Sequence, residues 1–148
     1  MTIVKLFGEV DTTKSLTELE GKDWGEPGLD SYLLQTCYNL RYKPLKYFEI
    51  EELRLMVDQD VGLQYLLPIA LEKLEADPLV RGKQFKGDLL CSVLCADPKF
   101  YRRNPHLRQR VERVVAAALA AKNLLPAQEL RLFEEEFDDA MEAFAGED

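Results

Sequence analysis

Apolar residues recur three and four positions apart along most of this chain, and this spacing constrains its fold more than any other feature. Such spacing places apolar side chains on one face of an α-helix, whereas the strict alternation of a half-buried strand is scarce. The clearest stripe follows Pro126 and consists of Leu130, Phe133, Phe137, Ala140, Met141 and Phe144. We therefore expect an all-α protein, a compact irregular array of about seven helices, with a short strand or extended tail over residues 3–7.

Capping residues, prolines and glycines divide the chain into its helices. The segments that these signals delimit are a short turn and four longer helices, over residues 15–20, 31–42, 50–59, 63–76 and 89–95. Asp77, Asp97 and Asn104 each precede a proline, and a capping side chain before proline at the first helical position predicts three further helix starts. Pro68 lies inside the fourth of these segments, where it either kinks the helix or starts a new one.

The length and the apolar runs indicate one domain in the cytoplasm. A chain of 148 residues has single-domain size, and no internal repeat or linker divides residues 1–148. The longest apolar run, over residues 114–121, is too short to cross a bilayer, and the N-terminus shows no secretory leader. Cys37, Cys91 and Cys95 are expected to be small buried side chains rather than disulfide partners, because the cytosol keeps thiols reduced.

The negative charge is concentrated at the C-terminal end. The sequence has 27 acidic and 19 basic residues, and nine acids but only one base lie from Pro126 onward. The residues before Pro126 are therefore neutral in sum, and the whole net charge of −8 lies in the last segment. A nucleic-acid-binding surface is disfavoured, because it requires a surplus of Lys and Arg. The acidic helix is either a solvated face that keeps the protein soluble or a negative patch that steers onto a positively charged partner.

Candidate binding residues follow from this charge pattern. They are acids of the last helix and acids on either side of Trp24, namely Glu134, Glu135, Asp138, Asp139, Glu142, Asp23 and Glu26. Trp24 itself is either a core anchor that closes its loop or an exposed interface residue. A basic stretch could bind RNA, but ion pairing with Glu112 and the last helix is favoured for its members, Arg102, Arg103, Arg108, Arg110 and Arg113.

Catalytic and metal-binding patterns are weak. His106 is the single histidine, and a nucleophilic pair with Cys91 or Cys95 would still need a third, orienting group. The same three residues fall short of the four ligands of a structural zinc site. The glycines of the 21–28 loop match no phosphate-binding or dinucleotide-binding motif. We therefore expect no catalytic residue, no metal and no cofactor.

A series of short segments resembles the immunity proteins of bacterial contact-dependent growth inhibition (CDI) systems. The segments fall within residues 15–95 and include LEGKDWGEP from residue 19, DSYL from residue 30, KPL from residue 43, ELRLM from residue 52, GLQYL from residue 62, PIAL from residue 68, DPL from residue 77 and GDLL from residue 87. Many short pieces occur in one order, and this makes the resemblance specific. No catalytic motif is among them.

The resemblance implies a helical cytoplasmic protein that binds a toxin domain delivered by a neighbouring cell and neutralises it without covalent chemistry. Such toxins are commonly nucleases, whose active sites must be basic to hold phosphates, and an acidic immunity surface would cover such a site. A monomer, or a 1:1 complex with the toxin, is expected. Two alternatives stay open: a helical hydrolase that uses carboxylates or a metal, marked by acids that converge in one concave pocket, and an acidic adaptor or regulator.

Overall fold

The structure is a computed structural model of the chain, in which residues 2–5, 8–24 and 31–146 are described. Its elements, in chain order, are β1 (Thr2–Lys5), β2 (Gly8–Asp11), α1 (Leu16–Glu20), α2 (Tyr32–Leu40), the 3-10 helix η1 (Leu45–Tyr47), α3 (Ile50–Asp58), α4 (Leu63–Ala76), α5 (Asp88–Leu94), α6 (Pro98–Arg103), α7 (Pro105–Ala121), the 3-10 helix η2 (Lys122–Leu124) and α8 (Ala127–Ala145). Eight α-helices in the described part of the chain confirm the all-α prediction.

Of the two predictions for the N-terminal segment, a short strand or an extended tail, the strand is confirmed by β1, which pairs with β2. Strands β1 and β2 form an antiparallel hairpin in which Thr2 lies opposite Asp11 and Ile3 lies opposite Val10. The sequence did not predict β2, because only Val10 among its four residues is a strong strand former, and alternation is not visible over so short a span.

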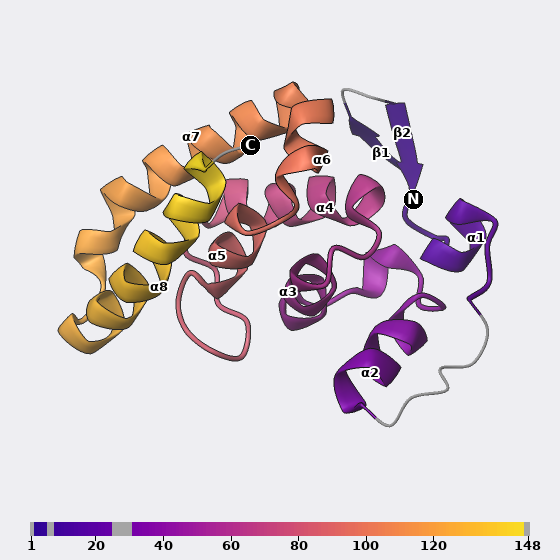
Figure 1. The fold of residues 1–148 in the computed structure, drawn as a ribbon, viewed down its shortest axis with the longest axis horizontal. Helices are drawn as coiled ribbons and strands as arrows, with labels where there is room; N and C mark the ends of the chain where they lie inside the picture. Colours follow the sequence, from indigo (N-terminus) through magenta and orange to yellow (C-terminus); the bar gives the residue numbers. More distant parts are fainter. Residues whose placement is uncertain (1, 6–7, 25–30, 147–148) are drawn as a thin grey trace.

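Helix α4 forms the centre of the core. Its buried apolar residues lie on more than one face and include Leu66, Leu67, Ile69, Ala70, Leu71 and Leu74. It packs against α3, α5 and α7, and Figure 1 shows it between α1 and α2 at one end of the molecule and α7 and α8 at the other. Pro68 is buried inside α4 and the helix continues through it, so no new helix begins there.

The helix predicted to start at Asp77 and Pro78 is wrong. Asp77 ends α4, and its carboxylate accepts a hydrogen bond from the Leu79 amide, 3.1 Å away, which closes a turn instead. The following amides of Gly82 and Gln84 donate to the side chain of Asp88 rather than to backbone carbonyls four residues earlier. The starts predicted at Asp97 and Asn104 are confirmed by α6 and α7. The Asp97 side chain caps α6 as predicted, whereas that of Asn104 does not cap α7 and donates to the Phe100 carbonyl instead.

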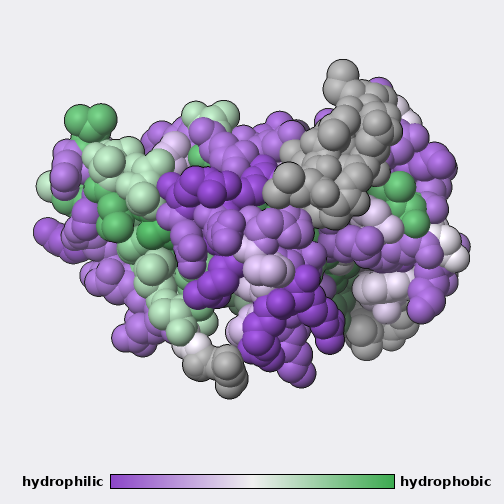
Figure 2. All heavy atoms as spheres, turned by 90° about the horizontal axis from the view of Figure 1, so that it is seen from above, coloured by the Kyte–Doolittle hydropathy of each residue, from purple (hydrophilic) through white to green (hydrophobic). Residues whose placement is uncertain are grey.

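The surface is polar over much of its area. Figure 2 shows hydrophilic side chains over the middle of one face and apolar side chains toward the end where α7 meets α8. Leu119, Leu124 and Leu132 are exposed at that end. None of the helices in the described residues is long and apolar enough to cross a membrane.

Candidate functional site

The acidic helix α8 is held on the molecule by its apolar face. Phe133, Phe137, Ala140 and Phe144 are buried at the spacing that the sequence predicts. Phe133 is fully buried, and its ring stacks on that of Phe137 with 4.9 Å between the ring centroids. Through this face α8 packs on α5, so its carboxylates are left on the solvent side.

Most carboxylates of α8 have no internal counter-charge. Exposed acids that form no ion pair with a described residue are Glu135, Glu136, Asp138, Asp139 and Glu142. Glu134 differs, because Nζ of Lys122 lies 2.8 Å from its Oε2 atom. Four of the five acids predicted on this helix therefore carry charge that nothing in the described structure neutralises, and Glu136 joins them.

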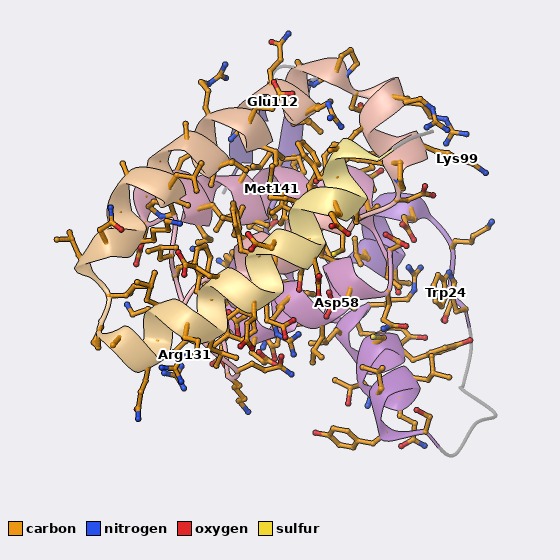
Figure 3. All side chains as sticks on the ribbon, turned by 60° about the vertical axis from the view of Figure 1, so that its left-hand side comes forward. Trp24, Asp58, Lys99, Glu112, Arg131 and Met141 are labelled. Atoms are coloured by element: carbon orange, nitrogen blue, oxygen red, sulfur yellow. The ribbon has the colours of Figure 1, made fainter. Side chains whose placement is uncertain are left out.

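The remaining predicted acids do not join this face. Asp23 lies in the connection between α1 and α2, where its carboxylate accepts a hydrogen bond from the Tyr42 hydroxyl. In Figure 3 its neighbour Trp24 and Arg131 of α8 lie on opposite sides of the view, and Figure 1 places α1 and α2 away from α8. Glu26 lies outside the described residues. The sequence-predicted residues therefore do not form one site.

Trp24 combines parts of both interpretations offered for it. The Arg41 guanidinium lies 4.0 Å from its ring centroid, and the Tyr38 ring packs edge-on at 5.3 Å. Arg41 is buried and donates a hydrogen bond to the Lys22 carbonyl at 2.8 Å, which fixes the loop. The tryptophan is nevertheless 44% exposed, so it anchors the loop to α2 without entering the core.

A groove opens where α8 faces α3 and α5. It has a volume of about 210 Å³ and lies between Asp58 of α3 and the α8 residues Glu136 and Asp139. Cys91, Ser92 and Cys95 belong to its α5 side, and Phe85 and Ala140 contribute apolar surface. Figure 3 shows Asp58 close beside the ribbon of α8. Acids from two helices far apart in the sequence are thereby brought to one concave site.

One wall of the groove is fixed by Arg54 and its acidic partners. Arg54 is only 7% exposed, and its Nε and Nη2 atoms donate to the two carboxylate oxygens of Glu51 at 2.9 and 2.6 Å. Its Nη1 atom donates to Asp58 at 3.0 Å. The hydrogen bonds from Arg54 hold the pKa of the Glu51 carboxyl below its usual value. Asp58 is therefore neutralised within the protein, whereas Glu136 and Asp139 are not.

The same cluster clamps the loop that connects α4 to α5. Asp88, 2% exposed, accepts hydrogen bonds from the amides of Gly82 at 2.6 Å and Gln84 at 3.0 Å. Glu51 accepts another from the Lys83 amide at 2.9 Å. A Cβ at position 82 would lie 2.7 Å from a Glu51 carboxylate oxygen, so a larger residue there would displace the carboxylate that accepts from Lys83. These contacts explain why an aspartate stands at the first position of α5.

Comparison with known proteins places this scaffold in a family. Residues 18–111 match the family model of the CDI immunity proteins. The chain belongs to the CDI immunity proteins. The match contains the Arg54 cluster and the Gly87-Asp88 pair, and it ends before α8 begins. No curated protein and no solved structure matches the chain.

The thiols of this immunity protein are poor nucleophiles. Burial raises the pKa of Cys91 to about 12, and the nearby acids add to this effect. Cys95, which the sequence predicts to be buried, is exposed, because it ends α5 at the rim of the groove. Partial burial still raises the pKa of its thiol, as do Asp58, Glu136 and Asp139. At neutral pH both thiols are protonated, and thiolate is the reactive form.

Cys91, Cys95 and His106 do not assemble a metal site. Within residues 2–5, 8–24 and 31–146, no three side chains of His, Cys, Asp or Glu are arranged to hold a metal ion. His106 belongs to α7, whereas both cysteines belong to the α5 segment.

Two of the five arginines in the basic stretch, Arg108 and Arg110, make ion pairs within the immunity protein. Arg110 makes a two-pronged ion pair with Glu75 of α4, with both N–O distances 2.8 Å. Arg108 lies 3.5 Å from Glu112 and stacks on the Phe144 ring at 4.0 Å. Ion pairing is confirmed for these two arginines, although Arg110 pairs with Glu75 of α4 rather than with an acid of the last helix.

Sequence reasoning missed Asp58 and Glu136 as groove residues. The only sequence signal at Asp58 is its position four residues after Arg54, which predicts a local ion pair on α3 and no more. Glu136 stands in a run of three glutamates that a helix spreads around its circumference, so its direction depends on how α8 packs. Neither residue type nor spacing reveals that α3 and α8 line one groove.

Proposed function

We propose that this immunity protein binds its cognate CDI toxin domain without covalent chemistry and neutralises it by covering a basic, nucleic-acid-cleaving active site. The observation that carries the proposal is the row of exposed, unpaired carboxylates on α8. In this proposal the protein acts in the cytoplasm as a monomer that forms a 1:1 complex, and it needs no cofactor and performs no catalysis.

The charge of α8 suits such a partner. Arg54 and Arg110 are neutralised by acids of the same chain, Glu51 and Glu75. The exposed acids of α8 other than Glu134 have no such partner among the described residues. A nuclease must hold phosphates in a basic cleft, so an acidic helix competes with its substrate for the same cations. Complementary charge over exposed surfaces mainly raises the association rate and excludes wrong partners.

A carboxylate hydrolase is the second candidate, because the groove does gather several acids in one concave site. Two of the four acids that line it are already engaged: Asp58 pairs with Arg54, and Asp88 holds the loop amides. The nearby thiols are protonated at neutral pH. Together with membership of an immunity family, these observations favour binding over catalysis.

The proposal is tested by producing this chain together with the toxin domain encoded immediately upstream of its gene. We expect growth to be rescued and a stoichiometric complex to be recovered by size-exclusion chromatography. Toxin that still kills, with no complex formed, would contradict the proposal. The nuclease part is tested separately: purified toxin should cleave RNA or DNA, and a stoichiometric amount of this protein should stop the cleavage.

The role of the α8 face is tested by charge reversal. The double variant Glu135→Lys, Glu142→Lys is expected to associate with the toxin about tenfold more slowly at low ionic strength, because steering depends on complementary charge. The dependence of the association rate on salt should also weaken. Glu134 is left unchanged, since Lys122 already neutralises it.

A matched control separates the position of the charge from its total. Glu49→Lys, Glu72→Lys changes the net charge equally but at the start of α3 and on α4, and we expect its association rate to stay within about twofold of the wild-type rate. Rates measured by stopped-flow fluorescence that fall equally for both variants would show that net charge, and not the α8 face, guides association.

A further inference from the structure

The groove between α3, α5 and α8 has the size of one side chain rather than of a small-molecule ligand. Its volume of about 210 Å³ lies below the ~300–1,000 Å³ typical of small-molecule sites. Carboxylates stand on two sides of it, Asp58 from α3 and both Glu136 and Asp139 from α8. Phe85 and Ala140 add apolar surface to its lining. Apolar walls with charged rims fit a side chain that has an apolar stem and a charged end.

Ser92 is a mostly buried polar residue of the groove. Ser92 lines the groove and is only 6% exposed, yet its side chain makes no hydrogen bond to a described residue. Its hydroxyl is therefore available to hydrogen-bond with a group that enters the groove from outside. Glu136 and Asp139 likewise form no ion pair with a described residue. Hydroxyl and carboxylate oxygens are all acceptors, which a cationic donor group would satisfy together.

We propose that this groove receives one cationic side chain, an arginine or a lysine, from the bound toxin domain; the assignment rests on the proposed function. The stem of that side chain packs against Phe85 and Ala140, and its charged end donates to Glu136, Asp139 and the Ser92 hydroxyl. Arg54 does not repel it, because Glu51 and Asp58 neutralise Arg54. A charge pair that is desolvated in the groove would control dissociation more than association.

The test compares two neutralised pairs on the same helix. Glu136→Gln, Asp139→Asn removes the groove carboxylates, and Glu135→Gln, Asp138→Asn removes two acids that do not line the groove. We expect the groove variant, Glu136→Gln, Asp139→Asn, to dissociate from the upstream-encoded toxin domain at least about tenfold faster than the wild-type protein. The control variant, Glu135→Gln, Asp138→Asn, should dissociate less than about threefold faster. Ser92→Ala, which changes no charge, should also speed dissociation, by about threefold or more. Equal dissociation rates for the two pairs would overturn the groove assignment.

Double-mutant cycles identify the incoming side chain. Each Arg and Lys of the toxin domain is changed to Gln in turn. The affinity of each toxin variant is measured for the wild-type immunity protein and for its groove variant, Glu136→Gln, Asp139→Asn. One toxin residue should weaken binding to the wild type by at least about tenfold and have little further effect on the groove variant. The absence of any coupled residue, in a complex that otherwise forms, overturns the groove assignment alone. The absence of any complex with wild-type protein overturns the proposed function as well.

Discussion

Replacing Gly87 with alanine is expected to lower the free energy of unfolding by about 3 kcal/mol. Gly87 has a φ angle of +91°, which L-residues rarely adopt, and a Cβ at this position would lie 2.5 Å from two carbon atoms of the Phe133 ring. Phe133 is fully buried and stacked on Phe137, so its ring has no free space to move into. Backbone strain and overpacking therefore add, at about 1–2 and 1–3 kcal/mol.

Gly21 provides the matched control for this substitution. Its φ angle is +65°, but a Cβ at this position would have no atom within 4 Å beyond its chain neighbours, so Gly21→Ala carries the backbone cost alone. We expect that variant to lose about 1 kcal/mol. Urea denaturation followed by circular dichroism measures both. If the two variants lost the same stability, close packing of α8 against the start of α5 would not constrain position 87.

Local sequence signals predicted the helices well, because they act within one element. The apolar stripe of α8 was correct at Phe133, Phe137, Ala140 and Phe144, since helical periodicity alone decides which residues share a face. The error at Asp77 has the same local origin. A capping side chain before proline also suits a tight turn, and the competing Asp88 carboxylate that captures the next amides comes from outside the local window.

The candidate site could be predicted only in part, because its geometry depends on contacts between elements. Net charge located the acidic helix, but it did not show that Lys122 neutralises Glu134 or that Glu136 turns toward α3. Charge type alone groups Asp23 with the α8 acids, and the fold separates them. The family match extends over residues 18–111, so the assignment of the α8 face rests on charge and geometry.

Replacing Asp88 with alanine is expected to cost about 3–5 kcal/mol of unfolding free energy. The Asp88 side chain is 1% exposed and lies 3.9 Å from Arg54. Its removal leaves the amides of Gly82 and Gln84 without their acceptor and takes one negative charge from a buried guanidinium. Hydrogen bonds to a buried charged group are among the strongest single contacts in a protein, and their donors are costly to leave unpaired.

Asp77→Ala is the control, because Asp77 is exposed and holds a single amide, that of Leu79. It should cost about 1 kcal/mol, as the loss of one capping contact does. Chemical denaturation gives both values, and amide hydrogen exchange should show the 81–87 loop opening in Asp88→Ala but not in Asp77→Ala. Equal losses of unfolding free energy in the two variants would mean that the contacts of Asp88 do not hold the loop. Since Gln84 and Phe85 of that loop line the groove, the Asp88 variant should also bind toxin more weakly than its stability loss alone predicts.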